Sequence, residues 1–343
     1  MDLDGSGTLR VFKGKLSMID THTWALVLAA GEGNRLKSLT TASDGIAVPK
    51  QFCSLLGARS LLDDTLARAQ DLVPPERIFT IVAAQHRQWW DSPQCLQAWP
   101  NVIVQPKNRG TGIGILLAVL HIQERDPLAR IVFLPSDHYV QNEAVLAEAL
   151  REASRQLAEE QDKLLILGLE PEKIDPELGY ILPGTERSAG KFDVALFVEK
   201  PSRPIAEELI SRGALWNTFI IAAGGYKLQR MLEQRCGTIV SQLRTAVQKS
   251  VHLALGDAPV EEIYRRLPVV DFSRDVLEGQ EGVLRVLRVP QCGWSDLGTP
   301  ARVAEVLHRS APACDTADSG TYVNLAFQHR LATEQNAALP ALQ

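Results

Sequence analysis

The fold is decided by the stretch Trp24-Ala25-Leu26-Val27-Leu28-Ala29-Ala30-Gly31-Glu32-Gly33-Asn34-Arg35-Leu36. Its apolar first half ends just before a glycine, as expected for a parallel strand that is buried on both faces. The glycine loop that follows can bring backbone amides close to phosphate groups, and Arg35 can pair with the same groups. The stretch therefore predicts a phosphate-binding loop at the carboxyl end of a central strand.

Two other phosphate-binding motifs fit this loop poorly. The dinucleotide fingerprint G-x-G-x-x-G requires a third glycine where Leu36 stands, and it should enter a helix, whereas this loop runs on to Pro49. The triphosphate P-loop, G-x-x-x-x-G-K followed by Ser or Thr, does not occur in the chain. Nicotinamide binding and ATPase-type chemistry are therefore both disfavoured.

Strand-like and helix-like segments alternate after this loop. Helical spacing is present at 60–71, 86–97, 112–124 and 141–160, and strand-like runs at 77–84, 101–105, 130–135 and 163–169. The alternation predicts an α/β fold with a doubly wound, mostly parallel, Rossmann-like nucleotide-binding sheet that continues through 163–169.

The pattern changes in the second half of the chain. Two β-like segments between 179 and 200 flank a polar turn at 184–191, helices are expected between 205 and 267, and 283–289 is a further strand. These segments predict an antiparallel extension on the substrate side of the sheet.

Composition limits the classes of partner. The chain has 343 residues, of which 45% are hydrophobic, so it can bury a large core, and its net charge of −5 gives no cationic field for nucleic acid or anionic membranes. No apolar run reaches the ~18 residues that a membrane span needs. The five cysteines are an odd number without C-x-x-C spacing, which favours reduced thiols and a cytoplasmic protein.

Further polar motifs follow apolar, strand-like runs, at the places where such sheets bind ligands. Singly, each could be a turn, a core aromatic residue or a surface ion pair. They are Pro49-Lys50-Gln51-Phe52, Asn108-Arg109-Gly110-Thr111, Pro135-Ser136-Asp137-His138, Gly179-Tyr180, Phe197-Val198-Glu199-Lys200-Pro201, Trp216-Asn217 and Gly293-Trp294-Ser295-Asp296-Leu297-Gly298.

Together with G-x-G-x-R-L after the first strand, these motifs resemble the sugar-1-phosphate nucleotidyltransferases, particularly the mannose-1-phosphate guanylyltransferases (GDP-mannose pyrophosphorylases). The resemblance runs from about Trp24 to Val306. It implies a glycosyltransferase-A-like fold and a reaction of a nucleoside triphosphate with a sugar 1-phosphate that yields a nucleotide sugar and pyrophosphate. GTP and mannose 1-phosphate are the implied substrates, GDP-mannose the product and Mg²⁺ the cofactor.

The resemblance also implies roles for individual residues. The implied catalytic residues are Arg35, Lys50 and Lys200, and the implied nucleotide-binding residues are Ala30, Gly31, Gly33, Arg35, Lys50, Asn108, Arg109 and Thr111. The implied sugar-phosphate-binding residues are Gly179, Glu199, Lys200 and Asn217. Asp137 and Asp296 are the implied ligands of Mg²⁺, a hard cation that prefers carboxylate, phosphate and water oxygens, and His138 is expected to be a positioning residue.

The chain also departs from the family pattern. Ala30 replaces a common glycine, Asn34 replaces a common threonine, and Thr218-Phe219 stands where Ser-Gly commonly follows Trp-Asn. Three alternatives therefore stay open. The first is the same reaction with another pair of substrates, such as glucose 1-phosphate with UTP or dTTP, or with a heptose phosphate. The second is a catalytically silent regulator that binds nucleotide sugars, and the third is a glycosyltransferase, which would usually show D-x-D.

The expected organisation is an N-terminal extension at 1–22, a nucleotidyltransferase domain at 23–309 and a C-terminal tail at 310–343. The sequence leaves open whether the chain forms a homo-oligomer.

Overall fold

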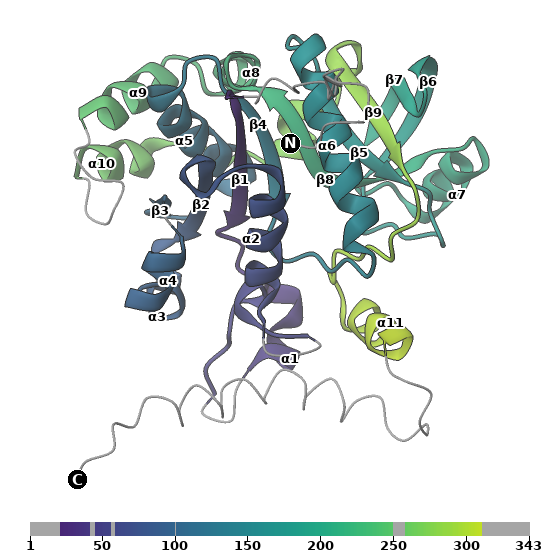
Figure 1. The fold of residues 1–343 in the computed structure, drawn as a ribbon, viewed down its shortest axis with the longest axis horizontal. Coiled ribbons are helices and arrows are strands. Elements are labelled where there is room, and N and C mark those ends of the chain that lie inside the picture. Colours follow the sequence, from purple (N-terminus) through teal and green to yellow (C-terminus); the bar gives the residue numbers. More distant parts are fainter. Residues whose placement is uncertain (1–20, 42–44, 56–58, 100, 250–257, 311–343) are drawn as a thin grey trace, which may run out of the picture.

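The computed structural model describes residues 21–41, 45–55, 59–99, 101–249 and 258–310, which form a layered α/β structure (Figure 1). Its strands are β1 (Thr23–Ala29), β2 (Ile78–Ala83), β3 (Val102–Gln105), β4 (Arg130–Pro135), β5 (Leu164–Leu169), β6 (Tyr180–Ser188), β7 (Lys191–Val198), β8 (Leu215–Gly224) and β9 (Leu284–Val289). Its α-helices are α1 (Lys37–Thr40), α2 (Leu61–Leu72), α3 (Arg87–Trp90), α4 (Pro93–Ala98), α5 (Gly110–Arg125), α6 (Glu143–Glu159), α7 (Arg203–Ser211), α8 (Gly225–Cys236), α9 (Ile239–Lys249), α10 (Ala258–Arg266) and α11 (Pro300–Ser310). The expected extension (1–22) and tail (310–343) lie outside the described residues, apart from residues 21, 22 and 310.

The parallel part of the sheet confirms the predicted fold class. Within the described residues the strands form one sheet in the order β3-β2-β1-β4-β8-β5-β9-β7-β6. β1 is parallel to both β2 and β4, and β2 is parallel to β3. The carboxyl ends of these four strands therefore meet at one edge, where polar side chains from distant parts of the sequence can converge.

The prediction of helices between 205 and 267 was wrong for one segment. Leu215–Gly224 forms β8, which lies in the middle of the sheet and is antiparallel to both β4 and β5. Its sequence, L-W-N-T-F-I-I-A-A-G, is almost wholly apolar because the strand is covered on both faces, and such a run has no period that separates a strand from a helix. The parallel sheet also does not continue through β5 as expected, since β8 separates β5 from β4.

The antiparallel extension is present at the other end of the sheet. β6 pairs with β7 and β7 pairs with β9, both antiparallel, while β9 is parallel to β5. The strands run through most of the predicted 184–191 turn, because β6 continues to Ser188 and β7 begins at Lys191. Gly190, with φ of 76°, supplies the left-handed residue that this tight connection requires.

Helices cover both faces of the sheet (Figure 1). Residues of α5, α8 and α9 pack on one face, and residues of α2, α6 and α7 pack on the other. α5 is buried nearly all round, which explains its apolar sequence. The helix expected at 86–97 is divided into α3 and α4 by the break before Pro93, because proline disfavours a helical residue before it.

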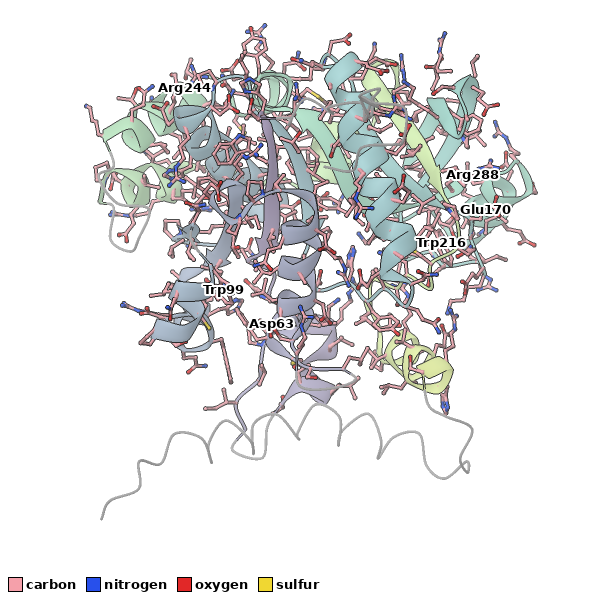
Figure 2. All side chains as sticks on the ribbon, viewed as in Figure 1. Asp63, Trp99, Glu170, Trp216, Arg244 and Arg288 are labelled. Atoms are coloured by element: carbon pink, nitrogen blue, oxygen red, sulfur yellow. The ribbon has the colours of Figure 1, made fainter. Side chains whose placement is uncertain are left out.

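Side chains follow the usual division between core and surface. Trp216 is 6% exposed and belongs to a buried hydrophobic cluster, whereas Glu170 and Arg288 form an ion pair on the outside; all three residues are labelled in Figure 2. Cys53, Cys95, Cys236 and Cys292 are all free thiols, as predicted for these positions. Among the helices of the described residues, none is both long and apolar enough to cross a bilayer.

Candidate active site

Lys50 is the centre of the polar cluster at the carboxyl edge of the parallel strands. It begins a short 3-10 turn, η2 (Lys50–Phe52), after Pro49. The side-chain amide of Gln51 donates to the carbonyls of Ala29 (2.9 Å) and Gly31 (3.0 Å), so this turn is held against the end of β1. Lys50 is only 4% exposed although it carries a charge. A lysine buried in this way must be paired, and its partners define the site.

Two aspartate-bearing segments supply those partners. The Nζ of Lys50 lies 2.9 Å from Oδ2 of Asp137 and donates to the backbone carbonyl of Asp296 at 2.5 Å. The two segments are themselves paired, because Tyr139 and Ser295 exchange backbone hydrogen bonds of 2.9 Å in both directions. Asp137 and Asp296 are therefore brought together by a short antiparallel bridge, although they lie far apart in the sequence.

The Lys50 ammonium also keeps Asp137 ionised. Burial by itself raises the pKa of this carboxyl and is the largest single cause, but the charge and hydrogen bond of Lys50, together with smaller contributions, outweigh it and hold the pKa below its ordinary value. Asp137 is thus a carboxylate at neutral pH. Its side chain remains 39% exposed, so it is still accessible to a ligand.

His138 has the structural character that the sequence suggested. Its Nδ1 accepts a hydrogen bond of 3.2 Å from the indole N–H of Trp294, and the two rings meet edge to face at 5.2 Å. Burial lowers the pKa of His138 to about 4, so the ring is neutral at physiological pH. A neutral imidazole that is fixed by Trp294 can position the Asp137 segment.

Arg35 and the glycine loop flank this cluster. Gly33 has φ of 60°, and a Cβ there would lie 3.1 Å from the backbone nitrogen of Lys50, so both conformation and space favour glycine. Half-buried Ala30 and exposed Gly31 continue directly from β1. The Arg35 guanidinium lies 2.7 Å from Glu177 on the β5–β6 connection, and both side chains are about half exposed, at 52% and 53%. The structure therefore holds Arg35 near the site but paired with a carboxylate.

The segment after β3 is placed less directly at the site. The amide of Asn108 donates to Glu32 in the glycine loop at 3.0 Å, which brings these two loops together. In contrast, the Arg109 guanidinium donates to the carbonyls of Tyr264 (3.0 Å) and Arg265 (2.6 Å) at the end of α10. The Thr111 hydroxyl accepts from the backbone of Phe272 at 2.9 Å. Among the implied nucleotide-binding residues, Asn108 contacts the loop, and Arg109 and Thr111 tie the start of α5 to neighbouring segments.

The implied sugar-phosphate residues form a second cluster at the ends of β6, β7 and β8. A Cβ on Gly179 would lie 2.6 Å from Oε2 of Glu199 and 3.2 Å from the Asn217 amide nitrogen, so these three residues are in direct contact. Lys200 Nζ lies 2.5 Å from Glu199 Oε1, and its side chain is 43% exposed. The sheet therefore brings Gly179, Glu199, Lys200 and Asn217 together.

Non-glycine residues with positive φ lie in or next to both polar clusters. In the described residues, the non-glycine residues with positive φ are Lys200 (52°), Phe219 (58°) and Leu297 (47°). Lys200 belongs to the sugar-side cluster, Phe219 follows Asn217 by two positions, and Leu297 directly follows Asp296. Such conformations cost about 1–3 kcal/mol each and are concentrated at functional sites, where surrounding contacts maintain them.

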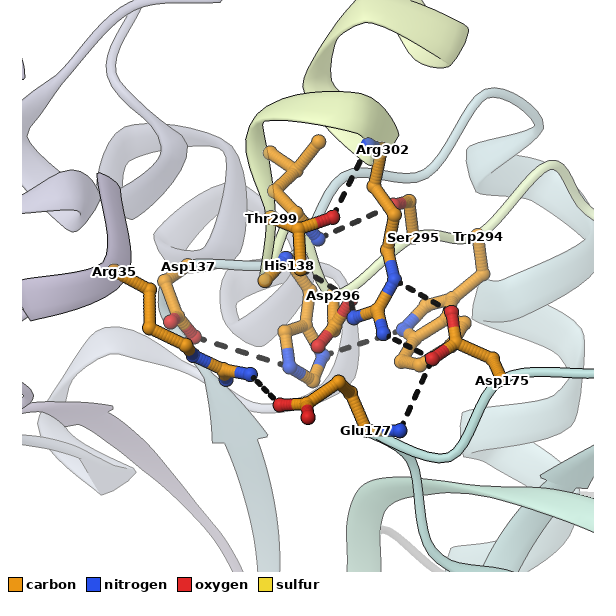
Figure 3. A network of polar contacts seen from close by, with 12 residues as sticks. Arg35, Asp137, His138, Asp175, Glu177, Trp294, Ser295, Asp296, Thr299 and Arg302 are labelled. Carbon is orange, nitrogen blue, oxygen red and sulfur yellow. Dashed lines mark hydrogen bonds and ion pairs between the residues drawn. The ribbon is translucent and has the colours of Figure 1, made fainter. Parts of the chain in front are cut away.

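Arg302 and Asp175 belong to the site although no sequence motif predicted them. Arg302, at the start of α11, is 5% exposed and forms hydrogen bonds with the carboxylates of both Asp175 and Asp296 (Figure 3). Burial opposes the charge of Arg302, but the hydrogen bonds that the guanidinium donates to these carboxylates and the two negative charges together outweigh burial and raise the pKa of the guanidinium. Nothing in the local sequence T-P-A-R-V-A indicates this role, because arginine in a helix usually lies on the surface.

The donor set fits a divalent cation of the kind that binds through substrate phosphates. Oδ1 of Asp296 accepts from Arg302 and from the backbone N–H of Gly298, whereas its Oδ2 accepts no hydrogen bond from the described residues. No group of three or more His, Cys, Asp or Glu residues in those described ranges could enclose a metal. Two carboxylates without a complete protein cage suit Mg²⁺, which keeps phosphate and water ligands.

Comparison with known proteins identifies the class of protein. The sequence pattern of the Nucleotidyl transferase family matches residues 24–311, which is most of the chain. The chain belongs to this nucleotidyl transferase family, whose members typically use a divalent metal.

Within this family, the chain is similar to proteins named for mannose 1-phosphate. The chain is 30% identical over 315 residues to the mannose-1-phosphate guanylyltransferase of Escherichia coli K12, covering 86% of this chain and 62% of the relative. It is 26% identical over 312 residues to the mannose-1-phosphate guanylyltransferase of Sinorhizobium fredii, covering 85% and 58%. A solved structure from Thermus thermophilus, described as a mannose-1-phosphate geranyltransferase, superimposes with a TM-score of 0.71 at 29% identity, covering 86% of this chain and 81% of that chain. The chain thus spans about 60% of the length of the curated relatives it matches.

Proposed function

We propose that the chain transfers a nucleotidyl group from a nucleoside triphosphate to a sugar 1-phosphate, with GTP and mannose 1-phosphate forming GDP-mannose and pyrophosphate. The observation that carries the proposal is the buried Lys50, which bridges the Asp137 side chain and the Asp296 backbone at the carboxyl edge of the sheet. The relatives named mannose-1-phosphate guanylyltransferase support the choice of substrates.

The chemistry explains why the site is rich in charge rather than in bases. A phosphate monoester has a second pKa near ~6, so the attacking sugar phosphate is already mostly dianionic and needs no strong general base. It attacks the α-phosphorus of the triphosphate, and the P–O bond to the pyrophosphate leaving group breaks. The main obstacle is repulsion between two anions, which cations and oriented amides must offset.

We assign the roles accordingly. Arg35, Lys50 and the amides of Ala30, Gly31 and Gly33 bind the triphosphate, and Arg35 leaves Glu177 when it does so. Lys200 binds the sugar phosphate, while Gly179, Glu199 and Asn217 contact the sugar hydroxyls. Asn108 contacts the nucleoside, and Arg109 and Thr111 act by fixing the start of α5. Asp137 and Asp296 would hold Mg²⁺, which when bound supplies positive charge to the reacting phosphates.

Two further assignments belong to this proposal. Residues 23–309 form the nucleotidyltransferase domain. The chain acts in the cytoplasm, where nucleoside triphosphates are made and where its free thiols stay reduced.

The test is pyrophosphate release by the purified protein in the presence of Mg²⁺. Five nucleoside triphosphates are crossed with mannose, glucose and heptose 1-phosphates. Asp137→Ala removes the proposed metal ligand, and Asp162→Ala is the matched control, because the Asp162 side chain is 77% exposed and lies outside the site.

A dominant signal for GTP with mannose 1-phosphate that is lost in Asp137→Ala and kept in Asp162→Ala supports the proposal. Another productive pair keeps the reaction and overturns the choice of substrates. No release with any pair, combined with binding of a nucleotide sugar, supports the regulator instead, which the altered glycine loop makes the second candidate.

A further inference from the structure

Helix α11 contacts both the segments around the glycine loop and the β5–β6 connection. Its apolar residues Val303 and Val306 pack in a cluster with Leu36, Val48 and Leu61, which flank the glycine loop and the Lys50 turn. Its charged face meets the β5–β6 connection. The helix is therefore placed to set the position of one of these parts relative to the other.

Three ion pairs join α11 to the β5–β6 connection, and they differ in burial. Lys173–Glu305 (2.5 Å) and Arg309–Glu172 (2.9 Å) are both about 40% exposed and contribute little. Arg302–Asp175 is different, because the two side chains are only 6% and 12% exposed. The pair is a two-bond fork, with Nε to Oδ2 at 2.8 Å and Nη2 to Oδ1 at 2.6 Å. Such a fork fixes the plane of the guanidinium.

The remaining guanidinium nitrogen, Nη1, contacts Oδ1 of Asp296 (Figure 3). The backbone N–H of Gly298 donates to the same oxygen at 3.0 Å, so Oδ1 is held by two donors while Oδ2 is left without a hydrogen-bond partner in the described residues. Arg302 therefore acts on Asp296 both as an oriented donor and through its positive charge, while the fork with Asp175 fixes its position. The negative charge of Asp296 is thus least compensated on Oδ2, the oxygen that lies against Gly298.

We propose that Arg302, fixed by Asp175, is a positioning residue that orients the Asp296 carboxylate so that its Oδ2 can bind the divalent cation. The inference rests on the proposed function, because that function is what requires a cation between the carboxylates and the phosphates. Residues that orient metal ligands typically change metal affinity about 10–100-fold when they are mutated.

The network continues from Asp175 toward the substrates. Oδ1 of Asp175 also accepts from the backbone N–H of Glu177 at 3.1 Å, and Glu177 pairs with Arg35. The backbone of Asp175 exchanges hydrogen bonds with the Tyr180 hydroxyl next to Gly179. The same fork therefore fixes the segment that carries the sugar-side residues, and its loss should affect cation binding and sugar binding together.

The experiment measures cation binding directly, through the free Mn²⁺ signal in electron paramagnetic resonance during titration of the full chain. The test variants are Arg302→Lys, which keeps the charge but loses the fork, and Asp175→Asn, which keeps the volume. Asp296→Asn defines the loss of the ligand itself. Arg309→Met is the matched control, because it breaks an exposed ion pair between the same helix and the same connection. Thermal unfolding of each variant checks that it is folded.

The expected result is Mn²⁺ affinity reduced about tenfold or more in Arg302→Lys and Asp175→Asn, with a parallel rise in the Mg²⁺ concentration for half-maximal rate and an unchanged Arg309→Met. Wild-type Mn²⁺ affinity in folded Arg302→Lys and Asp175→Asn overturns the inference, and so does wild-type affinity in Asp296→Asn. Failure of the proposed function looks different: no turnover in the wild type with any substrate pair, while Mn²⁺ binding still depends on Asp296 and Arg302.

Discussion

Gly179→Ala tests the sugar side of the site at a single atom. The added Cβ would lie 2.6 Å from the Glu199 carboxylate and 3.2 Å from the Asn217 amide, so the carboxylate must move by several tenths of an ångström. Gly179 has an ordinary negative φ, and the atom displaced is the end of a side chain, so the fold itself should tolerate the change. The loss is therefore expected in substrate binding rather than in stability.

The magnitude follows from the contact that is disturbed. A hydrogen bond from a sugar hydroxyl to a charged carboxylate contributes about 1.5–3 kcal/mol. Its loss lowers kcat/KM for the sugar phosphate roughly 10- to 150-fold. The apparent KM for the nucleoside triphosphate should change little, because Gly179 lies on the sugar side of the site.

The assay is pyrophosphate release at saturating triphosphate and varied sugar phosphate. Gly184→Ala is the matched control on β6, the strand that begins directly after Gly179, because its Cβ would meet no atom closer than 3.4 Å. The assignment of Gly179, Glu199 and Asn217 to the sugar is refuted if Gly179→Ala keeps kcat/KM for the sugar phosphate within about twofold of Gly184→Ala.

Three more predictions follow from individual residues. Arg35→Met should lower kcat/KM for the triphosphate about 100-fold or more, because it removes a proposed contact to the phosphates. The free energy of urea unfolding should change by no more than about 0.5 kcal/mol, because the ion pair with Glu177 is half exposed. Equal kinetics in Arg35→Met and the control Arg151→Met, which changes an exposed arginine, would contradict the role. Gly110→Ala should destabilise the protein by about 2–4 kcal/mol, because φ is 81° and the Cβ would lie 2.8 Å from the Val270 carbonyl carbon. The control Gly213→Ala has a similar φ of 84° but open space around the Cβ, so it should cost only about 1 kcal/mol. Equal unfolding midpoints for the two variants would show that the contact with Val270 is unimportant. Burial lowers the pKa of His121 from 6.5 to about 4, so the unfolded state binds its proton first as the pH falls, and stability is present above pH 6.5 and lost toward pH 4. His121→Gln should remove about 2 kcal/mol of the difference in unfolding free energy between pH 8 and pH 5, and an unchanged difference would mean that His121 is accessible to protons in the folded state.

The sequence determined the local parts of this protein. The apolar run from Trp24 to Ala29 indicated a buried strand because it is short and is followed at once by glycines, and those glycines predicted a loop at its carboxyl end. The motifs containing Lys50 and Asp137 were found in the same way, because each polar group follows directly after an apolar run or a fixed proline. Such features depend on neighbours in the chain, which a sequence displays.

The tertiary structure decided which distant segments meet. Leu215–Gly224 lies between β4 and β5 because both of its faces find apolar cover there, and no local period records that choice. Arg109 was expected near the nucleotide but donates to the end of α10, since those carbonyls lie within its reach. Arg302 becomes a buried partner of Asp175 and Asp296 only because α11 folds back onto the β5–β6 connection. Whether two residues far apart in the chain come into contact depends on how the whole chain packs. Local sequence patterns record only neighbours in the chain, so they do not reveal such contacts.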